Sequence, residues 1–203
     1  MQKKLCKTCR RLNFLLFEKC KSSMARKPYP PGMKSKKRRF RQTEYGKQLA
    51  EKQKLKFSYG LSEKQFKKYV TEVLKKRGRV EDEVEELVKK LEKRLDNIIY
   101  RLGLANSRRQ ARQLVSHSFF LINKKSINIP SYEVKQEDII SIKKAKLEKK
   151  ILKEILPQLK EKILPNWLKF DKKKFEGKII AEPSLKEVQP LVEISTIFEF
   201  YSR

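Results

Sequence analysis

Positive charge constrains this chain more than any other property of its sequence. The 203 residues carry 52 lysines and arginines against 24 acidic residues, a formal net charge of +28. Charge of one sign repels itself and opposes compaction unless a polyanion neutralises it. Nucleic acid is therefore the first partner that we expect, and an anionic membrane the second. The membrane is disfavoured because the longest apolar run, near 12–17, is far shorter than the roughly twenty residues of a spanning helix.

The charge is concentrated at the amino terminus. Residues 1–43 hold fifteen lysines and arginines against one acid, a net +14. Prolines and a glycine within 28–32 predict an extended or turning backbone, so we expect residues 1–42 to be loop-rich. Tyr29 and Phe40 lie among the cations and could stack on bases. This pattern favours an arm that lies on nucleic acid over a targeting peptide or a disordered tail.

Three amphipathic helices are predicted after the arm. The first lies within 43–60 and ends near Gly60. The second begins with a capping box of Ser62 and Gln65, and the third has acids first and bases last, the order that a helix dipole favours. The apolar stripes are Phe66, Tyr69, Val70, Val73 and Leu74 in the second helix, and Val80, Val84, Leu87, Val88, Leu91 and Leu95 in the third, whose pattern can extend to Gly103.

A fourth helix is predicted to begin with arginines. Ser107 and Gln110 form a capping box, which puts Arg108 and Arg109 in the first turn. Backbone N–H groups present partial positive charge there, so cations are mildly unfavourable and anions are attracted. We therefore expect a phosphate beside this turn. The predicted buried face is Ala111, Leu114 and Val115, with Arg108, Arg109 and Arg112 outside it.

Short strands are predicted in the second half of the chain. Residues 119–122 and 126–129 form a hairpin around a turn at Asn123–Lys124, and 138–142 is a further strand. A second hairpin is expected within 167–180, after a helical linker that Pro157 interrupts or kinks. The tail after residue 191 shows no firm pattern. Helices followed by helices against a small antiparallel sheet predict an α+β fold.

Long blocks along nearly the whole chain carry a family resemblance. They read, in order, "RKPYPPG", "EYGKQLAEKQKLKFSYGLSEKQF", "RLDNIIYRLGLANSRRQARQLVSHSFFLINKKSINIPSY", "PNWLKFD", "FEGKIIAEP" and "FEFYSR". In content and spacing they resemble the bacterial-type ribosomal protein S4 family of the small subunit, from bacteria or organelles. The resemblance implies a helical domain and an α+β domain with the S4 RNA-binding motif. It divides the chain into a basic arm with a cysteine cluster (1–42), a helical domain (43–93, completed by 185–203) and an RNA-binding domain (94–184, core motif 94–142).

The same resemblance implies a structural protein rather than an enzyme. Members of the family bind small-subunit rRNA at a junction of the 5′ domain early in assembly. They lie beside ribosomal proteins S5 and S3, where mRNA enters the ribosome, and contribute to translational accuracy. We expect a cytoplasmic bacterial ribosome or an organelle ribosome, with no membrane partner. The residues implied for rRNA are Arg108, Arg109, Arg112, Ser116, His117, Lys124, Tyr45, Lys52, Lys54, Tyr59 and Gln65, and the basic stretch that approaches mRNA is Lys37, Arg38 and Arg41.

Three cysteines lie in the arm: Cys6, Cys9 and Cys20. An odd number, without a secretory signal, predicts a reducing compartment and no structural disulfide. The resemblance implies that the protein requires no cofactor, although many members of the family have four cysteines that bind zinc or an iron–sulfur cluster. Here Ser22 stands near the position of the fourth, and three thiolates do not complete a tetrahedral site. Either water or a neighbour supplies a fourth ligand, or the three thiols stay free.

Two other classes of RNA-binding protein share parts of this sequence pattern. "RLD" at 94–96 also occurs at the catalytic aspartate of some pseudouridine synthases that carry the same motif, but this chain has no room for a catalytic domain. We expect Asp96 to cap a helix or bridge to a basic neighbour. His117 is the only histidine, with no catalytic partner legible, so we expect it to pack or to bind RNA. A stand-alone stress or rescue factor would not need the helical and C-terminal blocks.

Overall fold

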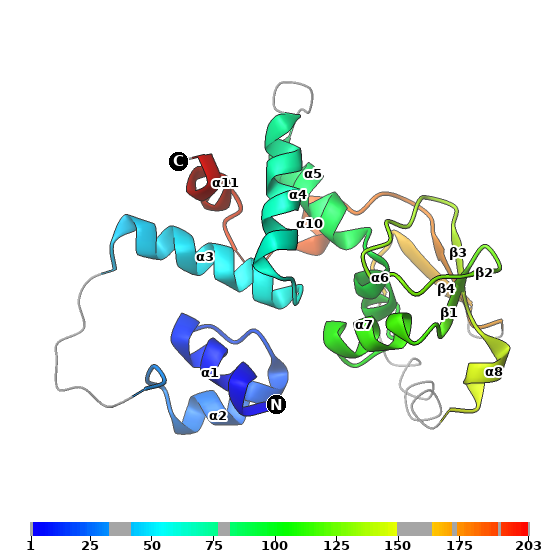
Figure 1. Cartoon of the computed structure of the whole chain (residues 1–203), viewed down its shortest axis with the longest axis horizontal. Coiled ribbons are helices and arrows are strands. Elements are labelled where there is room, and N and C mark those ends of the chain that lie inside the picture. Colours follow the sequence, from blue (N-terminus) through cyan, green and yellow to red (C-terminus); the bar gives the residue numbers. More distant parts are fainter. Residues whose placement is uncertain are drawn as a thin grey trace. The chain divides into compact units, whose positions relative to one another are not determined.

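The chain forms two compact units, which are described separately (Figure 1). The first unit is Met1–Arg77 with Pro190–Arg203, and the second is Gly78–Gln189. The structure, a computed structural model, describes residues 2–32, 42–76, 82–149, 164–171, 174–190 and 192–202. The fold is α+β, as predicted, because a five-stranded sheet lies in the second unit and helices make up the first.

Helices occupy much of the segment that we expected to be loop-rich. The prediction is wrong for 2–12 and 18–26, which are helical, because the prolines that motivated it begin only at Pro28. Cys9 and Cys20 are buried in this helical segment. Its elements are α1 (Gln2–Leu12), η1 (Glu18–Cys20) and α2 (Lys21–Arg26).

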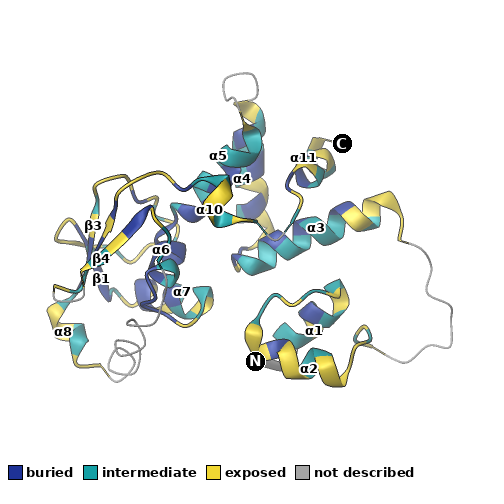
Figure 2. Ribbon diagram, turned by 180° about the vertical axis from the view of Figure 1, so that it is seen from behind, coloured by how far each residue is buried: buried dark blue, intermediate teal, exposed yellow. Residues whose placement is uncertain are grey.

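Side-chain caps begin the next two helices, and the cap at Ser62 is the predicted one. Thr43 caps α3 (Glu44–Ser58), and the Ser62 hydroxyl, which caps α4 (Glu63–Lys75), accepts the Gln65 N–H at 3.3 Å. α3 ends just before Gly60, whose φ of +64° suits a helix stop. Figure 2 shows buried residues on one side of α4; they include Phe66, Val70 and Val73. The tail without a firm pattern forms α11 (Ser195–Ser202), which packs on α3 and α4.

The third helix stops earlier than its apolar pattern suggested. α5 (Glu83–Glu92) and α6 (Leu95–Arg101) are separate because Arg94 between them is extended, with ψ of 135°. The backbone there bonds to a distant segment: the Leu95 N–H donates to the Tyr132 carbonyl at 2.9 Å. α5 packs with α6 and with α10 (Leu185–Val188) inside the second unit rather than with the helical domain expected to end at 93. The three-domain division itself stays a prediction.

One antiparallel sheet forms the rest of the second unit. Its strand order is β2-β1-β3-β5-β4. The strand predicted at 126–129 is wrong beyond Ser126, because the observed strand is Lys125–Ser126 and 127–129 have no regular structure. Of the predicted helical linker only α8 (Lys144–Leu147) is described, since 150–163, with Pro157, lie outside the described residues. The strands are β1 (Phe120–Ile122), β2 (Lys125–Ser126), β3 (Ile139–Ile142), β4 (Leu168–Asp171) and β5 (Glu176–Ile179).

The core of the second unit lies between α6, α7 (Arg108–Ser116) and the sheet. The predicted buried face of α7 is confirmed, since Ala111, Leu114 and Val115 are buried. Gly177 in β5 allows a close approach: a Cβ there would lie 2.6 Å from a methyl group of Leu102. The end of α6 therefore packs closely against the sheet at β5.

The helices are short. α3, with 15 residues, is the longest in the part of the chain that the structure describes. None of the described helices combines the length and hydrophobicity that crossing a membrane requires.

The β1–β2 turn generates a prediction about stability. Asn123 and Lys124 have φ angles of 47° and 68°, and the left-handed conformation costs an ordinary L-residue roughly 1–2 kcal/mol. We expect Lys124→Gly to stabilise the second unit by about 0.5–1 kcal/mol. The measurement is a urea midpoint followed by the fluorescence of Trp167, the single tryptophan, which is buried. Lys125→Gly, within β2, should instead lower the midpoint; a fall in both variants would contradict the turn argument.

Candidate nucleic-acid interface

The first turn of α7 is built by the predicted capping box. The Ser107 hydroxyl accepts the Gln110 N–H at 3.2 Å. The return bond differs from the expected one, because the Gln110 side chain accepts the N–H of Asn106, one residue before the cap, at 2.9 Å. Both bonds satisfy backbone donors that the helix start leaves open. They hold Arg108 and Arg109 at the positive end of the helix.

Arg108 and Arg109 differ in how they are held. Arg109 is exposed. The Arg108 Nε donates to the Asn97 side-chain oxygen at 2.7 Å, and its guanidinium lies 4.8 Å from the centroid of the Tyr100 ring. Residues of α6 therefore position the Arg108 side chain, whereas the Arg109 side chain extends into solvent.

Arg112 shares a buried carboxylate with Arg94. Asp96 is 2% exposed; Arg94 donates to it at 3.1 and 2.8 Å, and Arg112 at 3.0 and 2.7 Å. The prediction that Asp96 bridges to a basic neighbour is confirmed. Two guanidinium groups meet one carboxylate, so the cluster keeps one positive charge. The Arg112 side chain is 33% exposed and carries this charge to the surface.

A second buried acid links α5 to the same surface. Glu92 is fully buried and accepts two bonds from Arg101, at 3.0 and 2.9 Å, and one from the Asn97 amide at 2.8 Å. The other end of the Asn97 amide accepts from Arg108, so Glu92 reaches Arg108 through one residue. Burial of a carboxylate is costly unless it is paired and hydrogen-bonded. These contacts therefore restrict both the arginines and the helices that carry them.

Sequence reasoning missed Glu92, Asn97 and Arg101 as parts of this site. The sequence predicts a helical pattern across them and by itself assigns them no role. A signal was present: acids and an amide fall next to apolar residues in "LEKRLDNIIY", where burial is expected. Their partners could not be read from the sequence, because Arg108 and Arg112 lie on another helix.

The remaining predicted residues of the second unit lie elsewhere on its surface. Ser116 is the last residue of α7 and His117 follows it, so both lie at the end opposite the arginines. Nine residues at 1.5 Å each separate the two ends by roughly 13 Å. Lys124 is exposed in the β1–β2 turn. An extended ligand is needed to touch all three places, and a single small anion would reach only one.

In the helical unit the predicted residues split between surface and interior. Tyr45 is 52% exposed and packs against the Phe200 ring, with 5.4 Å between ring centroids. Lys52 and Tyr59 are buried. Lys54 forms an ion pair with Glu51 at 2.5 Å. Gln65, half-buried, lies in the first turn of α4.

Glu63 is the centre of an ionic cluster in this unit. Its carboxylate accepts from Lys52 at 2.6 Å, from Lys56 at 2.8 Å and from the Tyr201 hydroxyl at 2.9 Å. Burial raises the pKa of Glu63, but the hydrogen bonds from Lys52, Lys56 and Tyr201 outweigh it and lower the pKa from 4.5 to about 2. Burial and the Glu63 charge raise the pKa of Tyr201. The cluster ties α3 and α4 to α11.

The three cysteines come together without completing a metal site. The sulfur atoms of Cys6 and Cys20 lie 2.8 Å apart. Burial raises the pKa of the Cys20 thiol, and hydrogen bonds and charge from Cys6 and Cys9 add to the rise. Ser22 is exposed, and within the described residues no group of three or more His, Cys, Asp or Glu is arranged to hold a metal ion. The donor set therefore does not fit a structural zinc site.

The basic stretch predicted to approach mRNA cannot be placed. Lys37, Arg38 and Arg41 lie within 33–41, outside the described residues.

Comparison with known proteins now decides the family. A profile described as "Ribosomal protein S4/S9 N-terminal domain" matches residues 1–92, and one described as "S4 domain" matches residues 93–140. The "Small ribosomal subunit protein uS4" of Thermotoga petrophila is 42% identical over 206 residues, 98% of this chain and 97% of that protein. The chain belongs to the ribosomal protein S4 family. Its relative of the same name in Aquifex aeolicus is 47% identical over 187 residues, 89% of this chain and 86% of that protein.

The match to the S4 domain covers the cluster around Asp96 and the start of α7. The matched S4 domain contains α6, α7, β1, β2 and the start of β3, and with them Asp96 and both first-turn arginines. The enzyme alternative is not favoured, because the relatives are ribosomal proteins. Asp96 also lies buried between two guanidinium groups, where no substrate reaches it.

The Asp96 cluster generates a prediction about stability. Asp96→Asn removes the buried carboxylate charge that Arg94 and Arg112 share, which should destabilise the second unit by about 3–5 kcal/mol. As a control, Glu44→Gln removes the exposed pair with Lys47 and should cost less than about 1 kcal/mol. Urea unfolding followed by Trp167 fluorescence measures the first variant and far-UV circular dichroism the second. Similar small losses in both would contradict the cluster's role.

The Glu63 cluster generates a prediction about pH. A carboxyl group whose pKa is lower in the folded than in the unfolded protein stabilises the fold at any pH above its unfolded-state pKa. This contribution is lost as the pH falls through its folded-state pKa. The stability that wild type gains over Glu63→Gln should therefore be complete above about pH 4.5 and shrink toward pH 2. Thermal midpoints by circular dichroism between pH 6 and pH 3 measure it. A wild-type advantage that does not change with pH would contradict the ionic origin.

Proposed function

We propose that this protein is a structural component of the small ribosomal subunit that binds the 5′ domain of its rRNA. The observation that carries the proposal is the start of α7, where two arginines stand at the positive end of a helix. Arg108 is held there by Asn97 and Tyr100. No acid in the first turn of α7 offsets the charge. An external polyanion would supply negative charge beside this turn.

The arrangement suits RNA that is recognised by its shape. Arginines on α7, His117 at its far end and Lys124 in a turn form separate contact points on one domain. Contacts to phosphates and 2′-hydroxyls at such points fix the orientation of a folded RNA, without reading a base sequence. The proposed rRNA-binding residues are Arg108, Arg109, Arg112, Ser116, His117 and Lys124, with Tyr45, Lys54 and Gln65 of the helical unit; the buried Lys52 and Tyr59 act by supporting α3 and α4.

The family resemblance supplies the finer part of the proposal. The protein acts early in assembly and lies beside ribosomal proteins S5 and S3, where mRNA enters, and it contributes to translational accuracy. Lys37, Arg38 and Arg41 approach the mRNA. The protein works in the cytoplasmic ribosome of a bacterium or in an organelle ribosome. It requires no cofactor; zinc or an iron–sulfur cluster at Cys6, Cys9 and Cys20 would need a ligand from outside the chain.

The proposal predicts the effect of reversing the first-turn charges. Arg108→Glu with Arg109→Glu should abolish most of the preference for an rRNA fragment that holds the 5′-domain junction over a plain duplex. The control reverses two exposed lysines of the same unit, Lys169→Glu with Lys186→Glu, and should keep the preference. Dissociation constants are measured for both RNAs across a salt series, because charge alone gives equally steep slopes for each. An unchanged junction affinity in the arginine variant would refute the assignment.

A further inference from the structure

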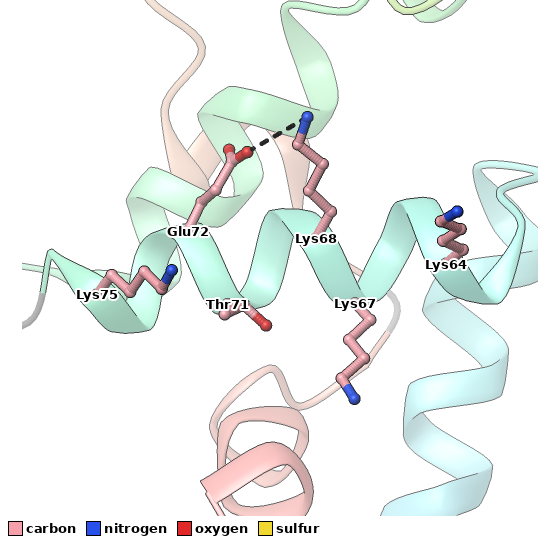
Figure 3. A pocket seen from close by; sticks show the side chains of 6 residues that line it. All are labelled: Lys64, Lys67, Lys68, Thr71, Glu72 and Lys75. Atoms are coloured by element: carbon pink, nitrogen blue, oxygen red, sulfur yellow. Dashed lines mark ion pairs between the residues drawn. The ribbon is translucent and has the colours of Figure 1, made fainter.

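We infer that the outward face of α4 is a further RNA-binding surface, which takes the phosphate backbone. This lysine face is defined by the residues that line a shallow hollow of about 360 Å³ (Figure 3): Lys64, Lys67, Lys68, Thr71, Glu72 and Lys75. The inference rests on the proposed function, because that is what makes RNA the partner.

The face is regular and rigidly held. Its residues follow the three- and four-residue spacing that places side chains on one side of a helix. From Lys64 to Lys75 the helix rises roughly 16 Å, at 1.5 Å per residue. The opposite side of α4 is buried through Phe66, Val70 and Val73, so the helix cannot turn its lysines elsewhere. All four lysines of the face are exposed.

Among the described residues, three of the four lysines of this face have no acidic partner, and the fourth, Lys68, pairs with Glu72. Lys67 would ordinarily pair with Glu63, four residues before it, but Glu63 binds Lys52, Lys56 and Tyr201 instead. Glu72 is the single acid of the face and lies 3.9 Å from Lys68; Figure 3 shows Lys68 turned toward it and Lys67 turned away. Within the ranges that the structure describes, no side-chain hydrogen bond or ion pair joins Lys64, Lys67 or Lys75 to another residue.

The neighbouring helix shows the opposite pattern. In α3, Lys47 pairs with Glu44 at 3.3 Å and Lys54 with Glu51 at 2.5 Å, while Lys52 and Lys56 share Glu63. Each lysine of α3 thus has an acidic partner within the chain, whereas Lys64, Lys67 and Lys75 of α4 have none among the described residues and are left to an external anion.

The spacing of the charges selects the kind of anion. Lysines spread along roughly 16 Å of helix fit successive phosphates of a strand better than one compact ion. Lysine acts on phosphate as a point charge, and the Thr71 hydroxyl can donate to a phosphate or sugar oxygen. The face has no aromatic side chain on which a base could stack, so it contacts the backbone and carries no base specificity.

The test compares two triple variants with equal loss of charge. The first triple variant removes the three lysines of the face that lack an acidic partner: Lys64→Gln, Lys67→Gln and Lys75→Gln. The second removes three exposed lysines of the other unit: Lys135→Gln, Lys169→Gln and Lys186→Gln. Glutamine keeps helix propensity near that of lysine, and circular dichroism checks the fold. Binding of the full chain to the 5′-domain rRNA fragment is measured across a salt series, with hydroxyl-radical footprinting of the RNA backbone.

Each lost phosphate contact should reduce the salt slope by roughly 0.7–0.9, so we expect a fall of roughly two or more in the first triple and little change in the second. The first triple should also lose protection of one backbone segment, while other protections remain. Equal changes in both triple variants would mean that net charge alone, and not the lysine face, sets the affinity. No change in the first triple variant would mean that the lysine face contacts solvent or an acidic protein instead of RNA. Either result overturns the inference. The proposed function fails separately, if wild type itself does not prefer the junction to a duplex.

Discussion

The carboxylate of Asp96 connects the core of the S4 domain to its charged surface. It lies buried on α6 and pairs with two guanidinium groups, that of Arg94, where the chain leaves α5, and that of Arg112, on α7. A buried carboxylate is tolerated only with such partners, so α5, α6 and α7 can pack in few other ways. Glu92 adds to this restriction through Arg101 and Asn97, and Asn97 in turn holds Arg108. The residues that stabilise the domain are therefore the same ones that position its cations.

Glu63 has the corresponding place in the helical unit. It draws Lys52 and Lys56 of α3 and Tyr201 of α11 onto one carboxylate. The choice of these partners leaves Lys67 without the acid that helix spacing would supply. One ionic cluster thus both joins three helices and determines which neighbouring face stays cationic. In each unit, a few acids determine which lysines and arginines are held in internal ion pairs and which remain exposed at the surface.

Local signals accounted for the elements that the sequence predicted well. The caps at Ser62 and Ser107, the stripe of α7 and the turn at Asn123–Lys124 depend on residues close together in the chain. The misses depend on distant contacts. Arg94 is extended because the backbone around it bonds to the segment near Tyr132, although the apolar pattern continues through it. The tail forms α11 because Ile197 and Phe198 are buried against other helices.

By itself, the sequence determined the net charge of +28, the family blocks, the α+β class and the arginines at the start of α7. Only the tertiary structure decided which cations are available to a ligand. Lys52 and Lys67 look alike in the sequence, yet one is buried in an ion pair and the other is exposed. The physical reason is that the strength of an ionic contact depends on distance and burial. Glu63 and Tyr201, or Asp96 and Arg112, meet only after the helices have packed.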